Sequence, residues 1–265
     1  MFPESQAFSR NRNGVQMKIE ILGCSGSVMN GYNTTSILIN GDTLIDAGSV
    51  ASAVSEEAIR AIRNILITHT HMDHIKELPF VLDTLFAQKH GEITIWGSAP
   101  TIDTLGRHIF NGLVWPEIRE YNLNGSFISL REVPKGEFAI GNLTVQSFPV
   151  DHIPGSVQYM LSEGNGYVLF SGDTTSDTRL FDLVRSLGDA LKAFFVEVSF
   201  PNRMEKIARI SYHLTPGLLE KALKGRVSPS TRVVAYHLKP KYIDEIVAEL
   251  PPNVAYITGG EAFEF

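Results

Sequence analysis

Three histidines and one aspartate fall within six consecutive positions in the first third of the chain. The run reads Thr68-His69-Thr70-His71-Met72-Asp73-His74 and holds three of the eight histidines in the sequence. Imidazole nitrogens and carboxylate oxygens are ligands of borderline-soft divalent ions such as Zn²⁺. An exposed loop without a role would not be expected to space histidines around an aspartate, and a purification tag would form a uniform run at a terminus. The run therefore predicts a metal site.

Three more candidate ligands occur elsewhere in the chain, and each directly follows a predicted strand, as the histidine run does. They are His152, Asp173 and His237. Residues far apart in sequence can meet when each ends a strand at the same edge of a sheet. Taken singly, they would be a loop histidine, a turn or helix-cap aspartate, and a partly buried histidine. Taken with the run, they predict one shared site.

The elements that would position these residues alternate between strands and helices. Apolar, β-branched runs predict strands at 17–22, 35–39, 43–46, 62–67, 93–96, 156–161, 167–171, 193–198, 232–236 and 255–258, and a hairpin over 138–150. Helical spacing predicts helices at 54–62, 75–88, 101–110, 178–186, 216–224 and 241–250. Thr215 reads as the N-cap of one helix and Pro216 as its first residue. We predict a loose leader over residues 1–16, then one domain over 17–265 made of two similar halves, with sheets inside and helices outside.

Composition limits the classes of function that the chain can have. The 265 residues are 43% hydrophobic, which is enough for one large core. The net charge of −6 is mixed along the chain and lacks the basic stripe that a long nucleic acid would need. The single cysteine, Cys24, excludes an internal disulfide and indicates a reducing compartment. No apolar run approaches the roughly 20 residues that span a bilayer, so we expect a soluble cytoplasmic protein without a membrane partner.

The seven candidate ligands resemble the pattern of the metallo-β-lactamase superfold. That pattern is His-x-His-x-Asp-His, then a distant His, an Asp after Gly, and a final His, and it matches His69, His71, Asp73, His74, His152, Asp173 and His237. The resemblance spans residues 17–260. It implies an α/β fold, the αβ/βα four-layer sandwich, in which two mixed sheets pack face to face with helices on both outer sides.

The same resemblance implies a pair of divalent metal ions. One ion would take His69, His71 and His152, the other would take Asp73, His74 and His237, and Asp173 would bridge them. Flavodiiron-type members carry Glu where this chain has His71, so redox iron chemistry is not expected. Zinc is the expected metal, with manganese or mixed occupancy as the alternatives.

Further segments resemble the class II cyclic-nucleotide phosphodiesterases. Glu197-Val198-Ser199-Phe200 and His213-Leu214-Thr215-Pro216 match that family's Glu-x-Ser-Phe and His-Leu-Thr-Pro segments. The resemblance implies hydrolysis of a small 3′,5′-cyclic nucleotide, cAMP or cGMP, to the 5′-nucleotide by attack of a metal-bridged hydroxide on phosphorus. Asp73 would orient the hydroxide, His213 would hydrogen-bond the phosphate or protonate the leaving oxygen, and Glu197 would orient His213. Phosphodiesterases of this superfold often dimerise, so a homodimer is a further expectation.

Two other readings stay open at this point. The first is a tRNA 3′-end-processing endonuclease or another hydrolase of the superfold. Against the endonuclease, only 20 residues lie between His152 and Asp173, too few for a tRNA-holding arm, and the net charge is acidic. The second is a metal scaffold or cyclic-nucleotide sensor without turnover. The base-stacking residue is also open, because the sequence does not choose among Phe80, Trp115, Phe200 and Tyr212.

Overall fold

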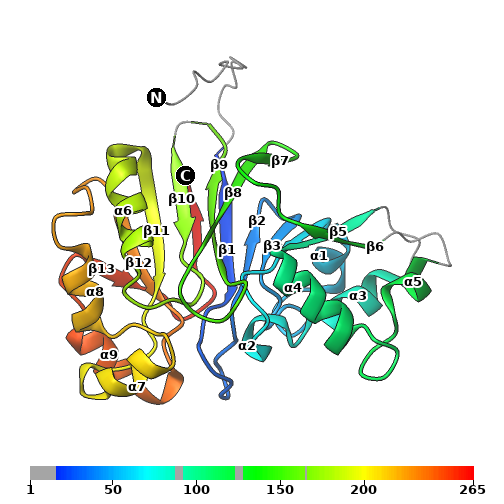
Figure 1. Ribbon diagram of the computed structural model, residues 1–265, viewed down its shortest axis with the longest axis horizontal. Coiled ribbons are helices and arrows are strands. Elements are labelled where there is room, and N and C mark those ends of the chain that lie inside the picture. Colours follow the sequence, from blue (N-terminus) through cyan, green and yellow to red (C-terminus); the bar gives the residue numbers. More distant parts are fainter. Residues whose placement is uncertain (1–15, 87–91, 123–127, 165) are drawn as a thin grey trace.

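Two seven-stranded β-sheets packed face to face form the centre of the molecule (Figure 1). The structure is a computed structural model and describes residues 16–86, 92–122, 128–164 and 166–265. The first sheet has the order β14-β1-β2-β3-β4-β5-β6, with β1 (Lys18–Gly23), β2 (Ser36–Ile39), β3 (Thr43–Ile45), β4 (Asn64–Leu66), β5 (Ile93–Gly97), β6 (Ile128–Glu132) and β14 (Ala262–Glu264). The second has the order β13-β12-β11-β10-β9-β8-β7, with β7 (Phe138–Ile140), β8 (Leu143–Pro149), β9 (Val157–Ser162), β10 (Tyr167–Phe170), β11 (Leu191–Glu197), β12 (Arg232–Tyr236) and β13 (Val254–Tyr256).

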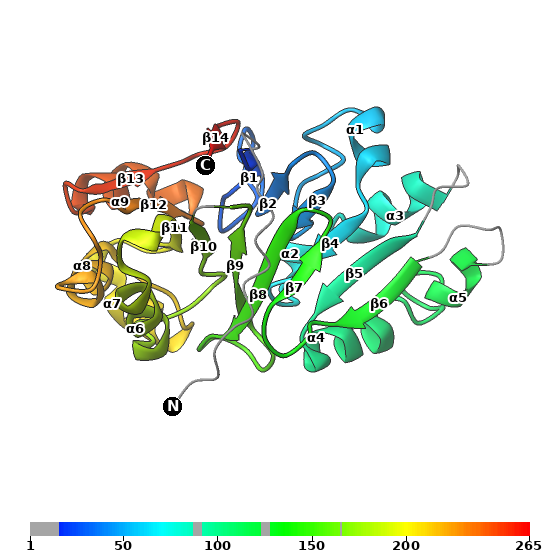
Figure 2. The same ribbon diagram turned by 90° about the horizontal axis from the view of Figure 1, so that it is seen from above.

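Helices cover the outer side of each sheet (Figure 2). On the side of the first sheet lie α1 (Glu56–Ala61), α3 (Leu78–Phe86), α4 (Ala99–Thr104) and α5 (Ile118–Tyr121). On the side of the second sheet lie α6 (Thr178–Leu187), α7 (Glu205–Ile210), α8 (Pro216–Leu223) and α9 (Ile243–Glu249). The single-turn helix α2 (Met72–Ile75) lies at the lower edge of the molecule in Figure 1. Among the described residues, no helix has the length and apolar character needed to cross a bilayer.

Three apolar clusters hold these layers together. One lies between the sheets and joins Ile19 of β1 to Phe195 of β11. The second packs the first sheet against its helices through residues such as Leu82, and the third packs the second sheet against its own. Adjacent residues of β11 point to opposite faces, as the period of a strand requires, so Phe194 contacts the helix layer with Leu219. The predicted αβ/βα four-layer sandwich is confirmed.

The strand directions bring several loops to one edge. Strands β3 to β6 run parallel to one another in the first sheet, and β10 to β13 do so in the second. The carboxyl ends of parallel strands meet at the same edge of a sheet, where loops can carry functional groups. The loops that follow β4, β10 and β12 are therefore available to a common site.

The predicted helix over 75–88 differs from the structure in one important respect. The chain forms two helices there, α2 and α3, and the last predicted residues lie outside the described part of the chain. The break arises because the loop at Ala47 inserts between them: its amide donates to the carbonyl of His74 at 2.7 Å, and its carbonyl accepts from the amide of Glu77 at 2.9 Å. Asp73 and His74 thus stand on a helical turn and not on a free loop.

Smaller differences occur elsewhere. α4 begins at Ala99, before the predicted start, because the side chain of Ser98 caps it by accepting from the amide of Thr101. The sequence did not predict α5, β6, α7 or β14, which are short or contain few apolar positions. Of the predicted leader, only Gln16 is described, and it is exposed.

The cap of α8 agrees with the sequence prediction and gives a stability test. The hydroxyl of Thr215 accepts from the amide of Leu218, and Pro216 opens the helix. We expect Thr215→Ala to lower the free energy of unfolding in urea by about 1 kcal/mol, because one amide of the first turn loses its partner. Thr215→Ser keeps the capping oxygen and should lose clearly less. Equal losses in the two variants would contradict the capping role.

Candidate metal centre

All seven candidate ligands come together at the edge where the strands end. His69 and His71 follow β4, Asp73 and His74 lie on α2, and His152, Asp173 and His237 follow β8, β10 and β12. They belong to groups of neighbouring residues, and within each group the potential ligand atoms lie within 4.8 Å of one another. Residues separated by more than 160 positions in sequence therefore face the same small volume.

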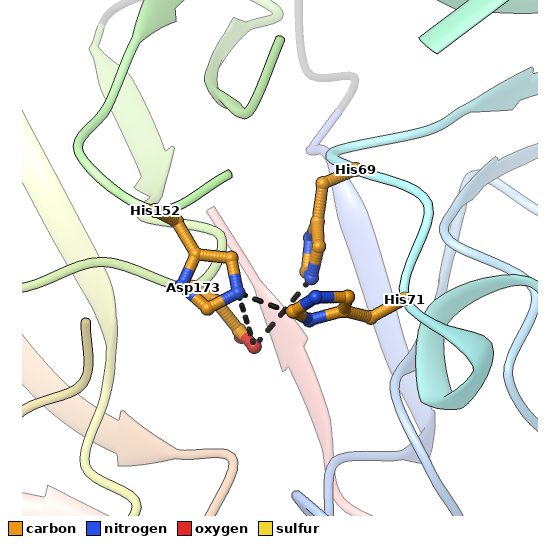
Figure 3. A group of neighbouring side chains, drawn as sticks. All are labelled: His69, His71, His152 and Asp173. Atoms are coloured by element: carbon orange, nitrogen blue, oxygen red, sulfur yellow. Dashed lines mark hydrogen bonds and ion pairs between the residues drawn. The ribbon is translucent and has the colours of Figure 1, made fainter. Parts of the chain in front are cut away.

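The first group contains His69, His71, His152 and Asp173 (Figure 3). Nε2 of His152 lies 3.1 Å from Nδ1 of His71. Oδ2 of Asp173 lies 3.7 Å from Nε2 of His69 and 3.9 Å from Nε2 of His152. The three imidazoles surround the carboxylate from different directions, which is an arrangement able to enclose one ion.

The second group contains Asp73, His74 and His237. Nε2 of His237 lies 3.2 Å from Oδ2 of Asp73 and 3.3 Å from Nε2 of His74. Oδ2 of Asp173 lies 3.4 Å from Nε2 of both His74 and His237. Asp173 thus stands between the two groups. Asp73 is half-buried and His71 is exposed, so the site opens to solvent on that side.

The hydrogen bonding of these residues is incomplete in a way that fits metal ions. Nε2 of His69 and Oδ1 of Asp173 are buried and have no hydrogen-bond partner. Buried polar atoms without partners cost free energy, so they are uncommon in folded proteins. Nε2 of His74 and Nε2 of His237 face each other, while the Nδ1 atoms of both rings are already engaged by Asp46 and Ser199. Both Nε2 atoms therefore point into the site, where they can serve as metal ligands.

The charge balance of the site also favours bound cations. Burial lowers the pKa of His69 and lowers that of His152 to about 4, so both rings are neutral and can offer a lone pair. Burial alone would raise the pKa of Asp173, but the neighbouring rings of His237 and His74 outweigh it and hold that pKa well below its usual range. Burial would likewise lower the pKa of His74, but Asp173 and Asp46 raise it instead. The centre attracts positive charge.

Asp46 is a site residue that the sequence reasoning missed. Its Oδ2 accepts from Nδ1 of His74 at 2.7 Å and from the hydroxyl of Thr68 at 2.8 Å, and its Oδ1 accepts from the amide of Thr68 at 2.8 Å. These bonds fix the ring of His74 with Nε2 toward the site, as carboxylates behind metal-binding histidines do. The available signal was the position of Asp46 at the end of a predicted strand, the same signal that identified Asp173.

His213 and Glu197 lie beside the second group. Nδ1 of His213 donates to Oε1 of Glu197 at 2.9 Å, and the hydroxyl of Ser199 donates to Oε2 of the same carboxylate at 3.0 Å. Ser199 in turn lies 2.9 Å from Nδ1 of His237. Burial would lower the pKa of His213, but Glu197 outweighs it and raises that pKa. One buried carboxylate therefore orients His213 directly and His237 through Ser199.

The backbone around the site is tight and locally strained. A Cβ added to Gly48 would lie 2.0 Å from the carbonyl oxygen of Asp73, so only glycine allows α2 to approach this loop. Among the described residues, the non-glycine positions with positive φ are Asn40, Asp46, Tyr212 and His237. The last three border the site. Strained backbone of this kind concentrates at functional sites.

A family model matches most of this chain, and the similar curated proteins include two kinds of phosphodiester-cleaving enzyme. Residues 31–238 match the family model of class-II cAMP phosphodiesterases. A probable 3′,5′-cyclic-nucleotide phosphodiesterase of Yersinia pestis is 27% identical over an alignment that covers 85% of this chain and 79% of that protein. A ribonuclease Z of Bacillus licheniformis is 25% identical, with 72% of this chain and 75% of that protein covered.

Comparison with solved structures gives the same fold. The crystal structure of unliganded yeast PDE1 superposes with a TM-score of 0.80 at 20% identity and covers 94% of this chain and 99% of that one. A metallo-β-lactamase fold protein, YhfI of Bacillus subtilis, superposes with a TM-score of 0.74 at 16% identity, covering 95% and 100%. These similarities establish the metallo-β-lactamase sandwich.

Proposed function

This chain belongs to the class-II cAMP phosphodiesterases, a family of metal-dependent hydrolases, and from that premise we propose that it hydrolyses 3′,5′-cyclic nucleotides to 5′-nucleotides at a site for two divalent ions. The observation that supports a metal site most strongly is that Nε2 of His69 and Oδ1 of Asp173 are buried and have no hydrogen-bond partner among the described residues. One ion would be held by His69, His71 and His152, the other by Asp73, His74 and His237, with Asp173 between them. Zinc is the proposed metal, and manganese is the alternative for metal analysis to test.

The bound ions supply positive charge for the phosphoryl oxygens and lower the pKa of a coordinated water. The residues of the chain orient the attacking water and supply the proton for the leaving oxygen. The pKa of Asp73 lies well below its usual range: burial opposes this shift, but the hydrogen bond from His237 outweighs burial. Asp73 therefore stays ionised at the solvent side of the site. There it can accept a hydrogen bond from the attacking water and hold one of the water's lone pairs toward phosphorus.

His213 is the proposed partner of the phosphate and of the leaving oxygen. Hydrolysis breaks the bond from phosphorus to O3′, and that oxygen must gain a proton. Because Nδ1 of His213 is engaged by Glu197, its Nε2 is the atom left to donate. The ring lies against His152, with 5.0 Å between centroids, so it is close to the proposed ligands without belonging to either of the two groups above. Glu197 is a positioning residue: it accepts from Nδ1 and raises the pKa of His213, which favours the imidazolium, the form that carries a proton on Nε2.

Two observations favour a small substrate over a tRNA. The described residues between His152 and Asp173 form the antiparallel pair β9 and β10, which belongs to the second sheet. That segment is therefore part of the core and supplies no arm for a tRNA. The net charge of −6 also lacks the phosphate-neutralising excess that long nucleic acids require.

A substrate panel tests the proposal. Metal-stripped protein and protein reconstituted with Zn²⁺ or Mn²⁺ would be incubated with cAMP, cGMP, a bis-aryl phosphodiester and a precursor tRNA. We expect the reconstituted protein to release 5′-nucleotide and the stripped protein to release none. Cleavage of the precursor tRNA alone would instead indicate a tRNA-processing endonuclease, like the 25%-identical ribonuclease Z. Tight binding of a cyclic nucleotide without release of product would indicate a cyclic-nucleotide sensor without turnover.

Asp46 gives a test of the metal site that does not depend on turnover. We expect Asp46→Asn to weaken Zn²⁺ binding by about 10- to 100-fold, because the ring of His74 loses the carboxylate that orients it. Metal-buffered titration of the stripped protein measures this directly. Asp42→Asn is the matched control, since Asp42 is exposed and lies on the same segment without contact to a proposed ligand. Unchanged affinity in Asp46→Asn would remove Asp46 from the site.

A further inference from the structure

A groove beside the proposed metal centre is the right size for a nucleoside and is lined by an exposed tyrosine, Tyr212. It measures about 500 Å³ and is lined by His152, by the loop after β8 and by Tyr212. Sites for small molecules typically measure roughly 300–1,000 Å³. His152 is also a proposed ligand of the first ion, so the groove and the metal centre share a wall. A ligand that extends past His152 from the metal centre enters this groove.

Tyr212 is available for contact with such a molecule. Tyr212 is 49% exposed. Among the described residues, none makes a ring contact or a side-chain hydrogen bond with it. Aromatic rings left open beside a catalytic centre suit flat, unsaturated ligands, because stacking on a base is tolerant of sequence and does not need a polar partner.

The backbone holds Tyr212 in place at some cost. Its φ is +55°, an uncommon conformation for a bulky residue. The carbonyl of Tyr212 accepts from Nδ1 of His152 at 3.1 Å, and the amide of the next residue, His213, donates to the carbonyl of Ala208 at 2.8 Å. The same contact that turns Nε2 of His152 toward the metal centre therefore fixes Tyr212 at the mouth of the groove. Strain maintained in this way points to a functional reason.

The other aromatic candidates are less suitable. Phe200 is buried, with its ring against His213 at 5.8 Å and Nζ of Lys239 on its face at 5.1 Å. Phe80 packs edge-to-face against Trp115, with 5.3 Å between centroids, and neither residue lines the groove. Tyr212 is the one of the four candidates that combines exposure with a direct link to a proposed ligand.

We propose that the groove is a nucleobase subsite in which the ring of Tyr212 stacks on the base of the cyclic nucleotide and of its 5′-nucleotide product. This assignment rests on the proposed function, because it takes the metal centre as the phosphate site. Tyr212 then contributes to substrate affinity through the base, whereas the ligands and His213 act on the phosphate.

The test compares two ligands that differ only in the base. Binding of 5′-AMP and of ribose 5-phosphate to the metal-loaded protein would be measured by titration calorimetry. Tyr212→Asn removes the ring but suits a positive φ, so the backbone should be kept. We expect it to weaken 5′-AMP binding about tenfold or more and to leave ribose 5-phosphate unchanged, since stacking is worth roughly 1–3 kcal/mol per base. Tyr212→Phe should bind both ligands as the unaltered protein does.

Tyr256→Ala is the matched control, because Tyr256 lies on β13 and is 47% exposed, like Tyr212. Equal affinity of the unaltered protein for the two ligands would overturn the subsite. So would a parallel loss for both ligands in Tyr212→Asn, because Tyr212 would then act through His152 on the phosphate. If 5′-AMP binds more tightly than ribose 5-phosphate but no cyclic nucleotide is hydrolysed, the proposed function fails and the subsite stands. If cyclic nucleotides are hydrolysed but the two ligands bind equally, the subsite fails and the proposed function stands.

Discussion

Replacing Asp173 by asparagine is expected to reduce kcat/KM for cAMP by at least about a thousandfold, because removing even one neutral hydrogen-bond donor to a transition state costs about 100- to 1,000-fold and Asp173 carries a full charge. Asp173 is buried and stands between both groups of proposed ligands, and its Oδ2 lies 3.4–3.9 Å from the Nε2 atoms of four imidazoles. Asparagine keeps its shape but removes the negative charge that balances two divalent ions. It also offers one acceptor oxygen where the aspartate offers two.

The expected loss should be accompanied by loss of metal. Elemental analysis of Asp173→Asn should find less than the full pair of ions, and circular dichroism should find the secondary structure retained. Asp182→Asn makes the same chemical change at an exposed position of α6 and should keep both turnover and metal. Full turnover by Asp173→Asn would be incompatible with the binuclear mechanism. Failure to fold would be recognised by circular dichroism, and His71→Ala would then serve as the test, since His71 is exposed and its loss costs little packing.

The sequence was a good guide to the candidate ligands because their signals are local. The histidine run has a spacing that an ordinary loop lacks, and Asp173 and His237 each follow an apolar strand. Once two mixed sheets are expected, the carboxyl ends of their parallel strands must lie near one edge. The segments around Glu197 and His213 were recognised by resemblance, and the structure places the two side chains in direct contact.

What the sequence could not supply depends on contacts between distant segments. Asp46 ends a predicted strand, but its partners are identified only when the pairing of β3 with β4 brings it next to Thr68 and His74. α2 has four residues, too few for a periodic pattern, and it forms because the loop at Ala47 holds it. The positive φ of Tyr212 and its exposure are likewise not predicted by any sequence pattern. These features are consequences of tertiary structure.

Removing the imidazole of His213 is the second large effect that we expect. His213→Ala should lower kcat for cAMP by about 100- to 10,000-fold, which is the range for loss of a positioned acid or base. The metal content should be preserved, since His213 is assigned to the leaving oxygen and not to a metal. The alternative role is that of a metal ligand, because His213 also forms a group of potential ligands with Asp173 and His237. Loss of an ion in His213→Ala would reassign the residue as a ligand.

The leaving group separates a proton donor from a group that only binds phosphate. The 3′ oxygen of a cyclic nucleotide leaves as a poor alkoxide and needs a proton, whereas p-nitrophenolate leaves without one. If His213 donates that proton, His213→Ala should be strongly impaired on cAMP and only slightly impaired on a p-nitrophenyl phosphodiester. Equal impairment on both substrates would instead mean that His213 binds the phosphoryl oxygens. Glu197→Gln should follow whichever pattern His213→Ala sets, with a smaller loss, because this carboxylate acts by holding Nδ1 of His213.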